Sequence, residues 1–370
     1  MKIVVLGYDH PVDDKRVWRT VRALAKKHEV VYIYRFDDSR IEIEEKLKRA
    51  YPNVKFEPVV LEARSLKGLY SFDKENVECV IESGADIWYL HTAPDTQPLT
   101  LFKEAKRKGI RLIYDSHELY PYAQFSRLVK RSKPKDLVRR LLTWHIFAMQ
   151  IEYSDAVILA SYAVKRYVQK VLGNMDHLYV IPNIGEKIDF GNVIKDIEKQ
   201  EKVVFVGLHW RPIPLDFIYV LHYEFGFAFE YVSSEPVEEL NKYSWVIWHS
   251  PMHRSEILGL LATAKWSIIL YDLPVYEKMN YALSVPNKLF DSISVFTPVL
   301  VRRHLIETSL WVDKFGVGLV IDDLADMRRK LEDVDYASIV GNIKKHYDKF
   351  VWGERWDKRI EGIVLGNCCV

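Results

Sequence analysis

The chain alternates short runs of β-branched residues with longer amphipathic segments, and it does so in two successive series. Strands that alternate with helices predict parallel sheets, because parallel neighbours need a helical crossover between them. The first series of expected strands comprises residues 2–7, 29–34, 86–90, 111–114, 156–160 and 178–181. The second comprises residues 203–207, 229–232, 244–248, 266–270 and 297–301.

A polar and charged stretch between residues 185 and 202 separates the two series. We therefore predict an α/β protein with two Rossmann-like domains. The first domain covers residues 1–186, a linker covers 187–201, and the second domain covers 202–350. Right-handed crossovers place the loops after the strands along one edge of each sheet, so two such domains in tandem are expected to face a common cleft.

The composition excludes some classes of function but does not identify the function. The net charge of +2 over 370 residues gives no strong field for nucleic acid, and no apolar run is long enough to span a bilayer. The start of the chain lacks the features of a signal peptide. The three cysteines, Cys79, Cys368 and Cys369, form no metal-ligand or disulfide pattern. A cytoplasmic protein is expected, with peripheral contact at the inner membrane face left open.

Several motifs resemble those of family four glycosyltransferases. They are DKRVWR at residues 14–19, YDSHELYP at 114–121, VIPN at 180–183, SVPNKLFD at 284–291 and TPV at 297–299. Their order and spacing carry the resemblance. A second resemblance, to xanthan-type glucuronosyltransferases, rests on HSPM at 249–252 and on Lys288 with Asp291.

Both resemblances imply a glycosyltransferase B fold, with the donor nucleotide on the second domain and the acceptor on the first. They also imply that residues 351–370, which contain WGERW at 352–356, form a last helix crossing back to the first domain. The nucleotide sugar is then a co-substrate, and no other cofactor is expected.

The segment 284–291 suits a nucleoside diphosphate. Ser284 is expected to cap a helix whose first turn tolerates Pro286, and the free amides at Asn287 and Lys288 would meet the phosphates. Lys288 adds a full charge there. Asp291 lies one turn after Asn287 and is predicted to accept the two ribose hydroxyls. A capped surface helix with a solvated Lys and Asp is the alternative.

Two further donor contacts are predicted from the resemblances. Arg211 and His209 follow the strand at 203–207, where the fold places basic phosphate ligands, although Leu208 stands where an Arg is often found. Met252 is assigned to the donor side. We expect no metal site, because the charge of Lys288, Arg211 and the helix amides would replace that of a metal. Leu283 and Phe296 stand where the family usually has Glu and Gly.

In the first domain, His117 and Glu118 follow a strand and are expected to face the cleft. The resemblance implies that His117 contacts the donor sugar in a retaining enzyme, whereas Glu118 or Asp115 acts as the base in an inverting one. Retention is preferred because the family four motifs cover more of the chain. His91 is a weaker candidate for the same site.

A basic segment lies between residues 127 and 140 and includes Arg131, Lys133, Lys135 and Arg139. It is assigned to the acceptor or membrane side, where it would hold an anionic headgroup. A solvated face is the competing interpretation.

The sequence thus predicts transfer of a sugar from a UDP-sugar or GDP-sugar to a carbohydrate or lipid-linked acceptor. Nucleic acid is not expected as a partner. A nucleotide-sugar epimerase of the same architecture remains an alternative, as does a degenerate sugar-binding paralogue without activity.

Overall fold

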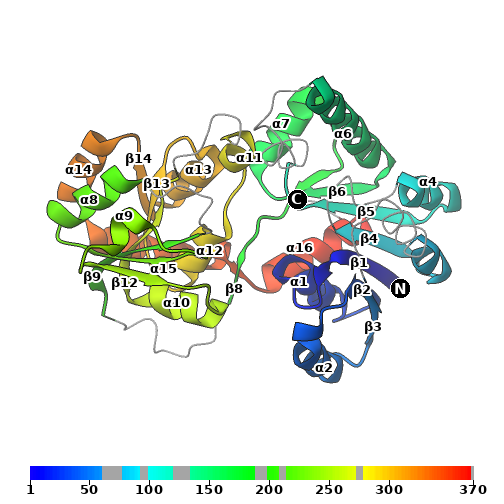
Figure 1. Cartoon of the computed structure of the whole chain (residues 1–370). Helices are drawn as coiled ribbons and strands as arrows, with labels where there is room; N and C mark the ends of the chain where they lie inside the picture. The colour runs from blue at the N-terminus through cyan, green and yellow to red at the C-terminus, as the bar shows by residue number, and fades with distance from the viewer. Residues whose placement is uncertain are drawn as a thin grey trace. The chain divides into compact units, whose positions relative to one another are not determined.

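The computed structural model describes residues 1–60, 77–91, 99–119, 134–187, 198–207, 214–271 and 278–367. The chain forms two compact units (Figure 1). One contains Met1–Pro182 together with Glu354–Val370, and the other contains Asn183–Gly353.

The first unit is built on a parallel sheet of seven strands within the described ranges. The strands are β1 (Lys2–Pro11), β2 (Glu29–Arg35), β3 (Val54–Val59), β4 (Ile87–His91), β5 (Arg111–Ser116), β6 (Ala156–Leu159) and β7 (Leu178–Val180). Their order in the sheet is β3-β2-β1-β4-β5-β6-β7. Ile3, Val4, Val5 and Leu6 are fully buried, as expected for a parallel strand covered on both faces.

Helices cover this sheet. They are α1 (Lys15–Leu24), α2 (Ile41–Ala50), α4 (Leu99–Lys108), α6 (Pro134–Tyr153), α7 (Tyr162–Leu172) and α16 (Glu354–Leu365), with a 3-10 turn η1 (Asp38–Arg40) before α2. The last helix packs against α1, as Figure 1 shows, and Lys26 pairs with its Asp357 at 2.6 Å. The end of the chain therefore belongs to the first unit.

The second unit has a parallel sheet in the order β11-β10-β9-β12-β13-β14. Its strands are β9 (Gln200–Val206), β10 (Ala228–Val232), β11 (Val246–His249), β12 (Ala264–Ile269), β13 (Val299–Arg302) and β14 (Gly318–Ile321). Its helices are α8 (Leu215–Tyr223), α9 (Glu238–Asn241), α10 (Arg254–Thr263), α11 (Lys278–Leu283), α12 (Asn287–Ser294), α13 (Ile306–Phe315), α14 (Leu324–Glu332) and α15 (Tyr336–Phe350). A separate pair joins β8 (Gly185–Glu186) to β15 (Val351–Trp352).

Two differences from the predicted strands have simple physical causes. Strand β3 was not expected, because it is an edge strand with solvent-facing Lys55 and a proline, Pro58, inside it. Strand β9 begins at Gln200, inside the predicted linker, because its first two residues are exposed and polar and carry no strand-like pattern.

Phe296 adopts a left-handed backbone with φ of 59°, and it is the only residue other than glycine with positive φ in the part of the chain that is described. This conformation costs a non-glycine residue roughly 1–2 kcal/mol. The ring of Phe296 stacks on Tyr347 with centroids 4.9 Å apart, which offsets part of that cost. The family's usual glycine at this position thus corresponds to a real backbone requirement.

In each sheet the strand order reverses once, between β1 and β4 in the first unit and between β9 and β12 in the second. Ligands of open α/β sheets bind beyond the carboxyl ends of the strands at such switch points. The two switch points are therefore where the functional side chains of each unit are to be sought.

Candidate functional site

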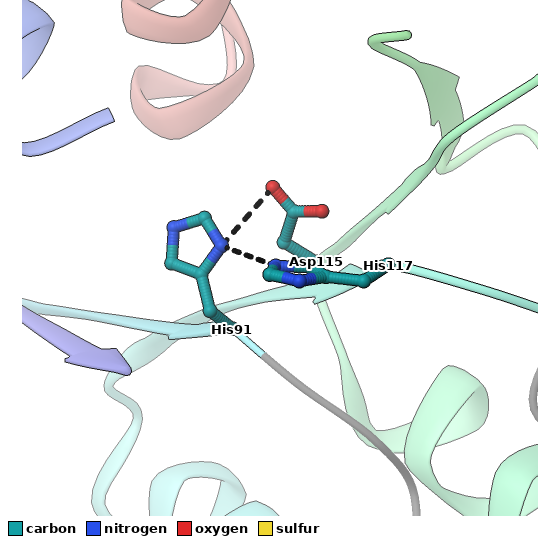
Figure 2. A group of neighbouring side chains, drawn as sticks. All are labelled: His91, Asp115 and His117. Carbon is teal, nitrogen blue, oxygen red and sulfur yellow. Dashed lines mark hydrogen bonds and ion pairs between the residues drawn. The ribbon is translucent and has the colours of Figure 1, made fainter. Parts of the chain in front are cut away.

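At the switch point of the first unit, three side chains converge from the ends of β4 and β5. The Nδ1 atom of His91 lies 3.0 Å from Nε2 of His117 and 3.5 Å from Oδ2 of Asp115 (Figure 2). His91 and Asp115 are buried, whereas His117 is partly exposed. Of the three, His117 is thus the one that a ligand can reach.

Asp115 is held on both of its oxygens. Its Oδ1 accepts hydrogen bonds from Nε and Nη2 of Arg16 at 2.9 and 2.7 Å. Its Oδ2 accepts one from the hydroxyl of Tyr89 at 2.9 Å. Arg16 also donates to the carbonyl of Ile181 at 2.9 Å, so the ion pair joins α1, β4, β5 and the end of β7. These contacts fix the position of the Asp115 carboxylate.

His10, at the end of β1, completes the cluster, and sequence reasoning did not single it out. Its ring lies 4.7 Å from that of His117, centroid to centroid. Its Nδ1 pairs at 3.2 Å with Asp14, whose other oxygen caps α1 by accepting from the amides of Arg16 and Val17. The spacing of His10 four residues before the capping Asp14 is the signal that would have found it.

The electrostatics of this cluster favour neutral imidazoles on His91 and His117. Burial lowers the pKa of His91 well below its usual range, and the nearby charge of Arg16 adds to this. Burial likewise lowers the pKa of His117, with further contributions from His10 and Arg16. The pKa of Asp14 is lowered, because the hydrogen bond and charge of His10 outweigh the opposing effect of burial.

The potential ligand atoms of His91, Asp115 and His117 lie within 4.8 Å of one another, a spacing that a metal ion could bridge. The same atoms are already engaged, however. Asp115 neutralises the guanidinium of Arg16, and the two imidazoles share one hydrogen bond. A cation would have to break these contacts beside a buried positive charge, so the geometry fits a hydrogen-bonded network better than a metal site.

Glu118 lies next to His117 on the same loop and is exposed. Its backbone carbonyl accepts a hydrogen bond from the hydroxyl of Ser116 at 2.9 Å. This bond anchors the loop that carries His117 and Glu118.

At the switch point of the second unit lies Lys288, the second residue of α12. Its Nζ contacts the hydroxyl of Tyr271, just after β12, and lies 4.9 Å from the ring centroid of Phe205 on β9. A Cβ atom on Gly207 would come within 3.1 Å of this Nζ, so the glycine leaves room for the ammonium. Three sequence-distant segments therefore bring one cation to this position.

The start of α12 differs from the prediction in one respect. Pro286 is the N-cap, and no side chain caps this end of the helix. Ser284 instead donates its hydroxyl to the carbonyl of Asn280 at 2.5 Å, so the expected Ser284 cap is wrong. The physical reason is that Ser284 continues the preceding helix α11 and finds its i−4 carbonyl there.

Asp291 lies further along α12 and is held by Arg254. Nη2 of Arg254 donates to Asp291 at 2.8 Å, and Nη1 donates to Glu186 on β8 at 3.0 Å. Asp291 remains partly exposed, with 16% of its side chain accessible. If Asp291 binds the ribose as predicted, its carboxylate would therefore do so while it is also paired with Arg254.

A hollow of about 690 Å³ opens after β11, next to α10. It is lined by Trp248, His249, Ser250, Pro251, Met252, His253 and Glu256. The imidazole of His249 is fixed by buried neighbours: its Nε2 lies 2.9 Å from Glu230, which in turn pairs with Lys202 at 2.8 Å. Met252, assigned to the donor side, thus lies in a preformed hollow, and α10 packs against α12.

His209, Arg211, Arg131 and Lys133 lie outside the described residues, and Lys135 and Arg139 lie in a part of α6 whose side chains are not described. In the portion of the chain that the structure covers, every helix is too short or too polar to cross a membrane.

Residues 15–184 match the family model described as Glycosyltransferase Family 4. The match covers just under half of the chain and shows that this segment is similar to glycosyltransferase family 4 domains. The matched segment supports a glycosyltransferase activity for the chain. None of the curated proteins matches the chain.

Solved structures share the fold over the whole length. A glycosyltransferase from Rickettsia africae is 11% identical with a TM-score of 0.65, and the match covers 99% of both chains. The lipopolysaccharide outer core galactosyltransferase WaaB is 12% identical with a TM-score of 0.63, over 100% of both chains. The UDP-GlcNAc 2-epimerase from Neisseria meningitidis is 14% identical with a TM-score of 0.60, over 99% of this chain and 100% of its own. The glycosyltransferase B fold predicted from the sequence is confirmed.

Proposed function

We propose that the enzyme transfers a sugar from a nucleoside diphosphate sugar, with UDP or GDP as the nucleotide, to a carbohydrate or lipid-linked acceptor. The observation that carries the proposal is the position of Lys288. Its ammonium lies at the switch point of the second sheet and at the uncapped start of α12. A diphosphate placed there would meet both a full positive charge and the N–H groups of the first turn of the helix.

The other parts of a nucleotide would find partners nearby in the same unit. The hollow lined by Trp248, His249 and Met252 offers an aromatic ring and polar groups for the base. Asp291 offers a carboxylate oxygen for the ribose. The structurally similar epimerase from Neisseria meningitidis binds UDP-GlcNAc, which supports a nucleotide sugar as the ligand of this fold.

The reaction we propose proceeds with retention. The bond between the anomeric carbon and the diphosphate oxygen breaks, and the acceptor oxygen forms its bond on the same face. The acceptor proton passes to the departing diphosphate, whose growing charge Lys288 and the amides of α12 stabilise. His117 contacts the sugar in this scheme, and Glu118 is not needed as a base.

The acceptor side is proposed to include Arg131, Lys133, Lys135 and Arg139. Each basic residue near an anionic surface contributes roughly 1 kcal/mol to binding. Replacing all four with Gln should weaken sedimentation with vesicles that contain anionic lipid, and unchanged sedimentation would argue for a solvated face.

The donor can be identified by a thermal-shift screen with UDP, GDP and ADP, because a bound nucleotide stabilises the folded state by mass action. The corresponding UDP-sugars or GDP-sugars are then offered with and without an acceptor. Release of nucleotide that requires an acceptor supports transfer, and proton NMR of the product reports the anomeric configuration. No stabilisation by any of the three nucleotides would contradict the proposal.

An epimerase is the second candidate, because two UDP-GlcNAc 2-epimerases share the fold across the chain. An epimerase converts the nucleotide sugar when no acceptor is present. Conversion of UDP-GlcNAc alone, followed by NMR, would therefore favour it over transfer.

A further inference from the structure

The hydrogen bond between His91 and His117 can form with the proton on either residue, and the surrounding geometry determines which residue carries it. One proton lies between Nδ1 of His91 and Nε2 of His117, which are 3.0 Å apart. If His91 carries the proton, His117 accepts through Nε2. If His117 carries it, His91 accepts through Nδ1.

The carboxylate of Asp115 decides between these two arrangements. Its Oδ2 lies 3.5 Å from the same Nδ1 of His91. A proton on Nδ1 points its positive charge toward both Oδ2 and the imidazole of His117. The opposite arrangement would set a nitrogen lone pair against a carboxylate oxygen in a buried setting, where such repulsion is poorly screened.

Asp115 cannot relieve that repulsion by turning away. Arg16 holds its Oδ1 at 2.7 Å, and Tyr89 donates to its Oδ2 at 2.9 Å. His91 is fully buried, and its ring packs 4.7 Å from that of Tyr89. The carboxylate and the inner imidazole are therefore fixed before any ligand arrives.

We infer that His91 is a positioning residue that fixes the tautomer of His117, so that His117 carries its proton on Nδ1 and acts as a hydrogen-bond donor. With Nε2 occupied as an acceptor, neutral His117 has no lone pair left for a ligand proton. Its other ring nitrogen, Nδ1, is then an N–H, which recognises an oxygen atom. The lowered pKa of both imidazoles, caused first by burial, keeps this pair neutral near pH 7.

This inference rests on the proposed function for the identity of that oxygen, which would be a hydroxyl of the donor sugar. A His117 that only donates cannot deprotonate the acceptor. The network therefore suits a reaction in which the departing diphosphate takes the acceptor proton, and it limits His117 to binding the sugar.

The direct test is spectroscopic and needs no substrate. Protein labelled with ¹⁵N-histidine is examined at pH 7.5 by long-range proton–nitrogen correlation, with His117 assigned from the spectrum of His117→Gln. We expect Nδ1 of His117 to show the signature of a protonated nitrogen and Nε2 that of an unprotonated one. A His117 protonated on Nε2 in the wild-type protein would overturn the inference, as would a tightly bound zinc ion that is lost in His117→Gln.

Two variants of His91 extend the test. The side-chain amide of His91→Asn can donate from near the position of Nδ1, so the tautomer of His117 should be kept, whereas His91→Leu should leave it mixed. We expect turnover of His91→Leu to fall roughly 10–100-fold, the range typical when a supporting partner is removed, with nucleotide affinity little changed. His91→Asn should recover part of that loss.

A matched control is His177→Leu, since His177 bonds the carbonyl of Ile151 at 3.2 Å elsewhere in the first unit. This change should leave the His117 signals in place. If His91→Leu also leaves the tautomer of His117 unchanged, His91 does not set it. Because the spectrum is read without substrate, a failed donor screen would contradict the proposed function and leave the tautomer result standing.

Discussion

Asp115→Asn should strongly destabilise the first unit, because it removes one charge of a buried ion pair and keeps the other. The side chain of Arg16 is 6% exposed and that of Asp115 is 2% exposed, with 2.7 Å between their charged atoms. Asn has nearly the same size and can still accept one hydrogen bond. The change therefore tests the charge and leaves the packing almost intact.

The expected magnitude follows from the burial. Breaking a buried pair by removing one partner typically costs about 3–5 kcal/mol, because the remaining charge is left without compensation. The exposed pair between Arg303 and Asp322, at 2.6 Å, is the matched control. Both of its side chains are about half exposed, so Asp322→Asn should cost at most about 1 kcal/mol.

Hydrogen exchange measured by mass spectrometry can report the loss of stability in the strands around Asp115. A loss of 3–5 kcal/mol corresponds to more than about 100-fold faster exchange of the β4 and β5 amides, at 1.36 kcal/mol per tenfold. Asp322→Asn should leave those amides unchanged. Exchange in Asp115→Asn within about fivefold of the wild type would refute the reasoning and show that Arg16 tolerates the loss of its partner.

Four further outcomes are expected. Burial lowers the pKa of Lys199 to about 8 from its ordinary 10.5, so the folded state loses this proton at a lower pH than the unfolded state does. The free energy of unfolding, measured by urea denaturation, should therefore rise between about pH 8 and 10.5 in the wild type. It should rise less in Lys199→Met. Phe296→Gly should be more stable than Phe296→Ala by about 1 kcal/mol in thermal unfolding, because only glycine adopts the left-handed backbone freely; a more stable alanine variant would contradict the strain. Lys288→Ala should weaken binding of UDP more than of uridine by calorimetry, and equal losses would mean that Lys288 does not touch the phosphates. Asp291→Asn should weaken the binding of UDP but should bind 2′,3′-dideoxy-UDP as tightly as the wild type does. A large difference between variant and wild type in the affinity for the dideoxy compound would place the carboxylate away from the ribose.

Local periodicity was enough to predict two parallel α/β units. Runs such as Val203–Phe205 bury both faces and are followed by helical patterns, so each strand could be recognised within its own segment. The helix after Pro286 was also predictable, because proline restricts where a helix can begin. The edge strand β3 was not predicted, because a half-exposed strand with polar residues has no continuous run of buried apolar residues.

The contacts that define the candidate site were decided only by the tertiary structure. His10, His91 and His117 lie far apart in the chain and meet because β1, β4 and β5 are neighbours in the sheet. The pairing of Arg254 with Asp291 likewise depends on how α10 packs against α12. Sequence periodicity records which face of a segment is buried, whereas the partner across that face is chosen by strand order and helix packing, which involve residues distant along the chain.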